Sequence, residues 1–369
     1  MKERFIALLK NETVFVISGL AALLSAFLVP VSSEYIGYID FKVIALLFAL
    51  MAVVAGLRSI GTFEVLSQKL LKLGSSVRFI SLTLVLLCFF IAMFVTNDVA
   101  LLTMVPFTFA ILDFISEKRI IFIVIMETIA ANLGSMLTPV GNPQNLYLFS
   151  YFKLSAIEFV KITLPITVLS LIMVVALTLI IKPQKINIVF DVEASITSRN
   201  KLIVYITLFL FCLCTVIGVL DYKIMFSFIM VAMLLVDRKM LKEVDYFLLM
   251  TFIFFFVFVG NISQIETVRF WVSDIIQGRV LISSILLSQV ISNVPAAVML
   301  SSFTADYKSL ILGTDIGGLG TLIGSLASLI SFKIYSQRKT ANKKLFLGAF
   351  TGINVVFLII LVAAAYIMM

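Results

Sequence analysis

The chain has 369 residues, of which 62% are hydrophobic and only 13% are charged. Soluble domains are about half apolar and about a quarter charged, so this composition excludes a soluble fold and predicts an all-α polytopic membrane protein. At roughly 20 residues per span, the chain accommodates about ten spans. The net charge of +8 comes from short basic groups between apolar segments. Such groups are typical of topology determinants and not of a nucleic-acid surface.

Apolar runs long enough to cross a bilayer predict the spanning segments. The first run follows a charged start, Met1 to Glu12, and has no cleavage site, so a retained first helix is expected. Histidine is absent, which excludes a His-ligated metal site. The predicted spans are residues 13–30, 40–57, 120–150, 159–181, 202–220, 222–236, 245–262, 308–332 and 345–367.

Two further apolar segments, 79–112 and 280–305, are each interrupted by a polar tripeptide. These tripeptides are Thr96-Asn97-Asp98 and Ser292-Asn293-Val294. Each segment is either a kinked span or a re-entrant hairpin that returns to its own face. If both are hairpins and the N-terminus is inside, three quarters of the 28 basic residues lie inside, as cytoplasmic loops require. We therefore predict two hairpins, an inside N-terminus and an outside C-terminus.

The order of elements repeats along the chain. An apolar helix opens at Asp40 and again at Asp245, and each is followed by an amphipathic stretch (63–74 and 266–277), a hairpin and a broken helix. Segments 132–145 and 315–328 align without gaps, with identities at Gly134/Gly317, Thr138/Thr321 and Gly141/Gly324. The predicted topology makes the repeats inverted, an architecture that recurs in carriers. The expected domains are an N-terminal repeat at 1–182, a cytoplasmic linker at 183–200 and a C-terminal repeat at 201–369.

The broken helices, 120–150 and 308–332, are the predicted binding elements. Gly141 and Pro143 cannot sustain regular helical hydrogen bonding, and freed backbone groups persist in hydrocarbon only where they face protein, water or a ligand. Freed carbonyls can coordinate Na⁺, with Asn97 and Asn293 as ligands, and half-helix N-termini attract anions. Alternatively, these residues only kink helices and join them. The candidate substrate and ion ligands are Thr96, Asn97, Asp98, Thr138, Gly141, Asn142, Pro143, Asn145, Ser292, Asn293, Thr321, Gly324 and Ser325.

These tips and breaks resemble those of the ion transporter superfamily, which includes divalent-anion/sodium symporters of the citrate and dicarboxylate type, arsenite permeases and D-type sodium/proton antiporters. The resemblance covers nearly the whole chain. In the symporters, a Ser-Asn-Thr tripeptide at each hairpin tip faces a broken helix with a Gly-x-Pro-x-Asn-like loop. In this sequence, residues 96–98 and 292–294 match the tips, and residues 141–145 and 324–328 match the breaks. The resemblance implies a scaffold domain and a transport domain that moves like an elevator, often within a homodimer.

The sequence also departs from the symporter pattern at both tips. Asp98 replaces the first Thr, and Val294-Pro295 at the second tip is closer to the arsenite-permease branch. An added carboxylate beside the ion site favours proton coupling or a cationic substrate, although Asp98 could equally be a helix cap. Glu127 and Asp315 lie within apolar helices and are further coupling candidates, or else satisfied polar contacts.

The sequence therefore predicts a secondary active transporter for a small anion, such as a di- or tricarboxylate, coupled to Na⁺ or H⁺ across the cytoplasmic membrane. The alternatives are a sodium/proton antiporter and an arsenite-type metalloid oxyanion permease. An enzyme is not expected, because the chain has neither a nucleophile with its base nor a metal motif. The expected partners are the small anion, the bilayer and a second copy of the chain, with no nucleic acid and no cofactor besides the coupling ion.

Overall fold

The computed structural model describes residues 12–186 and 193–369, and these residues are almost entirely helical. Within these two ranges there is no β-strand, only an isolated bridge between Ser76 and Lys185. Residues 1–11 and part of the predicted linker lie outside the described residues. The prediction of an all-helical polytopic membrane protein is confirmed.

Five of the described helices are long and apolar enough to cross a membrane unaided. Two other predicted spans form shorter apolar helices, α2 (Thr13–Leu28) and α12 (Tyr222–Val236). The five long helices are α4 (Phe41–Ser59), α10 (Ala156–Thr178), α11 (Arg199–Val216), α13 (Tyr246–Gln264) and α19 (Lys343–Met368). All five lie on spans that the sequence predicts.

The two interrupted segments form helical hairpins, and the two Gly-rich segments form broken helices. The hairpins are α6 (Val77–Ala92) with α7 (Asn97–Leu112), and α15 (Val280–Ile291) with α16 (Asn293–Ser301). The broken helices are α8 (Glu117–Ser135) with α9 (Pro143–Tyr151), and α17 (Tyr307–Ile316) with the 3₁₀ turn η2 (Leu322–Gly324) and α18 (Leu326–Ser336). The first break ends where Asn142 caps α9 by accepting from the Asn145 N–H at 2.9 Å.

Local sequence signals also fix the starts of α4 and α13. Asp40 and Asp245 are their N-caps, and each carboxylate accepts a hydrogen bond from the backbone N–H three residues later, at 3.0 and 2.9 Å. Both predicted amphipathic stretches are helical, as α5 (Thr62–Leu71) and α14 (Glu266–Ile276). The α14 helix meets α15 at a bend of 108°. Short turns, α3 (Glu34–Tyr38) and η1 (Met240–Glu243), precede α4 and α13.

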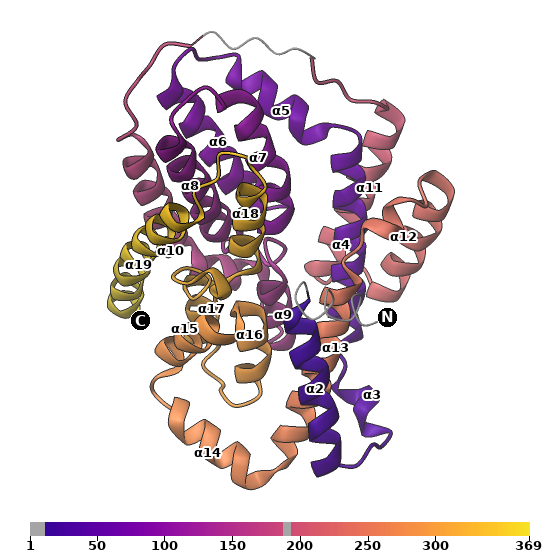
Figure 1. Ribbon diagram of the computed structural model, residues 1–369. Helices are drawn as coiled ribbons and strands as arrows, with labels where there is room; N and C mark the ends of the chain where they lie inside the picture. Colours follow the sequence, from indigo (N-terminus) through magenta and orange to yellow (C-terminus); the bar gives the residue numbers. More distant parts are fainter. Residues whose placement is uncertain (1–11, 187–192) are drawn as a thin grey trace.

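The helices form two groups that stand side by side (Figure 1). One group contains α6 to α10 and α15 to α19, and the other contains α2, α3, α4, α11, α12 and α13. Helices α5 and α14, which join the groups along the chain, lie at opposite ends of the molecule. Within the first group, the second arm of each hairpin packs against the second half of the other broken helix, α7 on α18 and α16 on α9.

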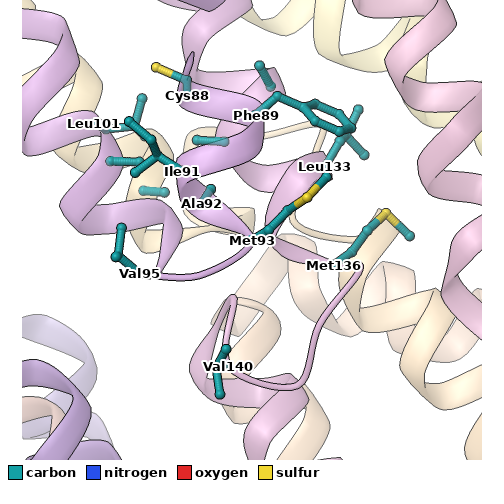
Figure 2. Close-up of a cluster of buried hydrophobic side chains, with 14 of the residues drawn as sticks. Cys88, Phe89, Ile91, Ala92, Met93, Val95, Leu101, Leu133, Met136 and Val140 are labelled. Atoms are coloured by element: carbon teal, nitrogen blue, oxygen red, sulfur yellow. The ribbon is translucent and has the colours of Figure 1, made fainter. Parts of the chain in front are cut away.

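Apolar packing holds the first hairpin against the first broken helix (Figure 2). Met93 and Val95 at the end of α6 lie over Met136 and Val140 of the break, and all four side chains are buried. The backbones of α6 and α8 also approach closely, because a Cβ atom on Gly134 would lie 2.0 Å from the carbonyl oxygen of Phe89. Close contact at small residues is how helices associate in a bilayer.

Candidate functional site

The two hairpin tips share one unusual backbone conformation. Thr96 has a φ of 70° and Ser292 a φ of 77°, values that residues other than glycine rarely adopt. The following residues, Asn97 and Asn293, each accept a hydrogen bond on the side-chain oxygen from the next backbone N–H, at 3.0 Å in both tips. Such strain persists only where the surroundings impose it, and it clusters at functional sites.

The first tip is fastened directly to the first break. The backbone N–H of Asn97 donates to the carbonyl of Gly141 at 3.3 Å. Its side-chain amide donates to Asn132 Oδ1 at 2.9 Å, near the end of α8. The hydroxyl of Thr138 donates to the carbonyl of Met93, which closes the loop onto α6. The break thus receives protein partners for part of the backbone that it frees.

The second break is held by Gln289, a residue on α15 that the sequence analysis did not single out. Its amide nitrogen donates to the carbonyls of Gly317 and Leu319, at 2.7 and 2.8 Å. Its amide oxygen accepts from the Thr321 N–H at 2.8 Å. The N–H of Gly324 donates to the carbonyl of Thr321 at 3.2 Å and closes the turn. The sequence did contain a signal for Gln289, because it is a large polar side chain in the mostly apolar first arm of the hairpin.

Asn132, at the end of the first half-helix, reaches the second break. Its side-chain oxygen accepts from Ser325 Oγ at 2.9 Å in addition to the amide of Asn97. Its side-chain nitrogen donates to Ser328 Oγ at 3.3 Å. Asn132 therefore joins the first tip to the start of α18, and its own polar atoms are all used.

Asp315 occupies the aligned position in the second broken helix and reaches the first break. Its Oδ1 atom accepts from the side-chain amides of Asn142, at 3.2 Å, and Gln144, at 3.4 Å. The contacts between the two broken helices are therefore reciprocal, since each half-helix end bonds to the break of the other. Gln144 lies in the segment that the sequence analysis aligned, but it was not predicted as a ligand.

Both tips and both breaks border one small cavity of about 50 Å³. Asn97 and Asp98 line it from the first tip, Ser292 and Asn293 from the second, and Ser325 from the second break. These five predicted ligands, which lie up to 228 positions apart in the chain, therefore share one site. One oxygen of Asp98, Oδ1, is buried without a hydrogen-bond partner.

A larger cavity of about 540 Å³ lies beside the first, between the two groups of helices. Asp98, Pro143 and Asp245 line both cavities, whereas Thr96 and Asn142 line only the larger. The large cavity is bounded mainly by α4 on one side and by the first tip and first break on the other. A cavity of this volume can hold a small solute beside the first tip.

The linings of both cavities carry far more negative than positive charge. The smaller one contains the carboxylates of Glu12, Asp98 and Asp245, and no Lys or Arg among its described residues. The larger one adds Glu64 and Glu243, and its one described basic residue is Arg58. The Arg58 guanidinium donates to the carbonyl of Leu102 at 3.2 Å. This carbonyl has no helical hydrogen bond from residue 106, because Pro106 lacks an N–H.

The remaining predicted residues lie away from these linings. Thr138, Gly141, Thr321 and Gly324 shape the two breaks through the backbone contacts described above, and Asn145 and Asp315 are buried behind them. Glu127 is fully buried between α7 and α8, where it accepts from Thr108 Oγ1 at 2.5 Å. Its other oxygen has no hydrogen-bond partner. Glu12, Asp245 and Glu243 line the cavities although the sequence analysis did not propose them as ligands.

Helical hairpins that meet two broken helices around a shared cavity are typical of a membrane transporter. The comparisons with known proteins agree, since residues 5–307 match the citrate transporter family. The chain is 33% identical to an uncharacterized transporter of Methanocaldococcus jannaschii, covering 95% of this chain and 96% of that protein. It is 28% identical to the inner membrane protein YbiR of Escherichia coli, covering 91% of each. Over 39% of this chain and 30% of the relative, it is 30% identical to a silicon efflux transporter of Oryza sativa subsp. japonica.

The chain therefore belongs to the citrate transporter family. It is a multi-pass membrane transporter and not an enzyme, as the sequence predicts. The family membership implies a small-molecule substrate and a lipid bilayer as its surroundings.

Proposed function

We propose that the protein is a secondary active transporter that carries a small anion, such as a di- or tricarboxylate, across the cytoplasmic membrane together with Na⁺ or H⁺. The observation that supports this most is the convergence of Asn97, Ser292, Asn293 and Ser325 on one cavity. Amide and hydroxyl groups of this kind bind partly dehydrated ions, and the α9 and α18 N-termini favour anions. Asn97 and Asn293 are the proposed Na⁺ ligands.

The charge of the cavities supports obligatory coupling to a cation. A carboxylate substrate in the smaller cavity would face Glu12, Asp98 and Asp245 with no basic side chain from the described lining. Negative charges that share one small cavity repel each other strongly where water is scarce. The anion must therefore bind together with Na⁺ or H⁺, and a cation that binds first would create the anion site.

The arrangement of the helix groups supports an elevator motion. Each hairpin tip belongs to the same group as the broken helices, and the 540 Å³ cavity separates that group from α4. Few pairs of helices contact each other across this boundary, mainly α4 with α9 and α13 with α16. We propose that the group containing α6 to α10 and α15 to α19, to which each inverted repeat contributes one hairpin and one broken helix, slides past the rest, with α5 and α14 as flexible connections.

Asp98 favours a second candidate function, a sodium/proton antiporter or a metalloid oxyanion permease. Asp98 lines both cavities and has one oxygen without a hydrogen-bond partner, and such a carboxylate can bind Na⁺ and H⁺ in competition. The similarity to a silicon efflux transporter supports an oxyacid as an alternative substrate, since silicon and arsenic both form weak oxygen acids.

Transport assays in proteoliposomes test the proposal. Uptake of labelled citrate, succinate and arsenite would be measured under an inward Na⁺ gradient, an inward proton gradient, or neither. Asn97→Ala and Asn293→Ala should each lower coupled uptake at least tenfold, because each removes a side chain from the shared cavity. Asn354→Ala is the matched control, since Asn354 is fully buried in α19, where it bonds to the carbonyl of Phe350, away from both cavities.

The results separate the two functions. Uptake of a carboxylate that requires a cation gradient and fails in both tip variants would support the anion symporter. Proton release on addition of Na⁺, without any anion, would instead establish the antiporter. Normal transport by both tip variants would show that the tips are structural and would refute the proposed site.

A further inference from the structure

Asp315 is a buried carboxylate with one oxygen atom left over. The residue is 2% exposed, at the end of α17. Its Oδ1 atom accepts two hydrogen bonds, from Asn142 and Gln144, whereas Oδ2 has no hydrogen-bond partner. A buried carboxylate oxygen without a donor is strongly unfavourable in a protein interior. Oδ2 is therefore free to take a proton or a cation.

A second unsatisfied oxygen belongs to a neighbour of this carboxyl group. Asn145 is fully buried, and its side-chain amide interacts with the Asp315 carboxyl. Its nitrogen also donates to the carbonyl of Met136 at 3.3 Å, but its Oδ1 atom has no donor. Each of these two neighbouring residues therefore keeps an unused oxygen acceptor, the kind of ligand that a proton or a small cation takes.

The aligned residue Asn132 provides an internal comparison. It has an equivalent place in the first broken helix, and its polar atoms bond to Asn97, Ser325 and Ser328. The neutral amide therefore fits its surroundings completely, whereas the carboxylate of Asp315 does not. The difference between the two positions is the negative charge, and that charge has no structural use in the contacts made by the protein.

No charged side chain of the hairpin elements packed against α17 can neutralise Asp315. Helices α15 and α16 carry no titratable residue, and α9 carries only Tyr147 and Tyr151. The Tyr147 hydroxyl is already paired with Ser301 at 2.7 Å, and Tyr151 OH donates to Ser302 at 3.4 Å. The donors that do face Asp315 are neutral amides.

The charged residues of the other neighbouring elements point elsewhere. On α10, Glu158 and Lys161 surround the start of α17, where Glu158 accepts from Tyr307 at 2.7 Å, about 12 Å along the helix from Asp315. The end of α19 reaches the same region, and its two lysines lie at its opposite end. On α8, Glu127 is bonded to Thr108 of the other hairpin, and the remaining charges occupy the first turn.

We propose that Asp315 and Asn145 form a buried binding site for a monovalent cation, either H⁺ or Na⁺, that accompanies each transport cycle. This inference rests on the proposed function as a cation-coupled carrier and adds a cation site behind the tips, separate from the proposed Na⁺ ligands Asn97 and Asn293. Occupancy of the site is transmitted to the smaller cavity through Gln144, which lines that cavity and whose side-chain amide donates to Asp315. An empty site leaves a buried charge, which disfavours the packing of α17 against the first break.

Cation binding can be measured on the purified full-length protein without any substrate. The midpoint of thermal unfolding would be followed against NaCl, with choline chloride holding the ionic strength constant, and separately from about pH 5 to about pH 9. A cation that binds the folded state raises this midpoint as its concentration rises. A Na⁺ site gives a rise with NaCl, whereas a proton site gives a rise as the pH falls.

Three variants then decide whether Asp315 is responsible. Asp315→Asn keeps the shape of the side chain and removes its charge, so this variant should fold. The shift of its unfolding midpoint with the cation should be at least tenfold smaller than in the wild type. Asp315→Glu keeps the charge and should retain the dependence with altered affinity. If Asp315→Asn does not fold, Asn145→Ala should show the same loss. Glu127→Gln is the comparison, because it removes a different buried carboxylate with an unpartnered oxygen.

The inference is overturned if the wild-type midpoint responds to neither cation, or if Asp315→Asn leaves both the Na⁺ and the pH response unchanged. Loss of the response in Glu127→Gln but not in Asp315→Asn would assign the site to Glu127 instead. Because unfolding needs no substrate, a failed transport assay with an intact cation response at Asp315 would count against the proposed function alone.

Discussion

Replacing Gly141 with alanine should both destabilise the protein and stop transport. A Cβ atom at this position would lie 2.0 Å from the carbonyl oxygen of Ser135, whereas ordinary contact begins at 3.4 Å. The break must therefore move by about 1.4 Å. The carbonyl of Gly141 accepts from the Asn97 N–H at an already long 3.3 Å, so a shift of this size separates the first tip from the break.

The expected cost combines two effects. Overpacking a buried site costs about 1 to 3 kcal/mol, and a lost hydrogen bond adds about 0.5 to 1.5 kcal/mol. We therefore expect Gly141→Ala to lower the free energy of unfolding by about 1.5 to 4.5 kcal/mol. The control is Gly348→Ala in α19, where a new Cβ meets nothing within 4 Å. This control should gain up to about 1 kcal/mol, because alanine favours a helix over glycine.

Both variants would be compared in one detergent by denaturant unfolding and in proteoliposomes by substrate uptake. Gly348→Ala should transport like the wild type, whereas Gly141→Ala should lose at least nine tenths of its uptake rate. If Gly141→Ala is as stable as Gly348→Ala and transports normally, the close approach at the break does not exist and the reasoning fails.

Three further predictions concern other parts of the chain. Arg58→Gln should slow anion uptake about tenfold, since it removes the one basic side chain in the described lining of the larger cavity; an unchanged rate would exclude a role in attracting the substrate. The hydrogen bond from Lys201 holds the pKa of Asp237 below its usual range, so the pair stabilises the protein near neutral pH and loses this effect as the pH falls through that pKa. In unfolding measurements Lys201→Met should therefore cost about 1 kcal/mol or less at pH 7 and nothing in acid, and equal costs at both would contradict the linkage. Cysteines at positions 113 and 151 should be labelled from the inside and the outside respectively, and the reverse pattern would invert the predicted topology.

The sequence alone determined the class of fold and the position of every break. Apolar composition leaves only helices in a bilayer, and the closely spaced Gly141, Asn142 and Pro143 mark a helix end through local rules, although a single proline does not, since Pro106 and Pro165 lie inside helices. These signals are local, so Pro143 and the Asn142 cap could be located without knowledge of any tertiary contact. The alignment of 132–145 with 315–328 likewise matched Asn132 to Asp315. In the structure, Asn132 bonds to the second break and Asp315 bonds to the first.

Only the tertiary structure decided which polar groups satisfy one another. The sequence offers Asp98, Glu127 and Asp315 alike as coupling candidates, one at a hairpin tip and two within apolar helices. The fold places Asp98 in both cavities, Glu127 against Thr108 and Asp315 beside the first break. These partners are 19 or more positions away, and hydrogen bonding across such separations depends on how the helices cross. Sequence periodicity carries no information about that crossing, whereas the packing of α7 on α18 and of α16 on α9 fixes it.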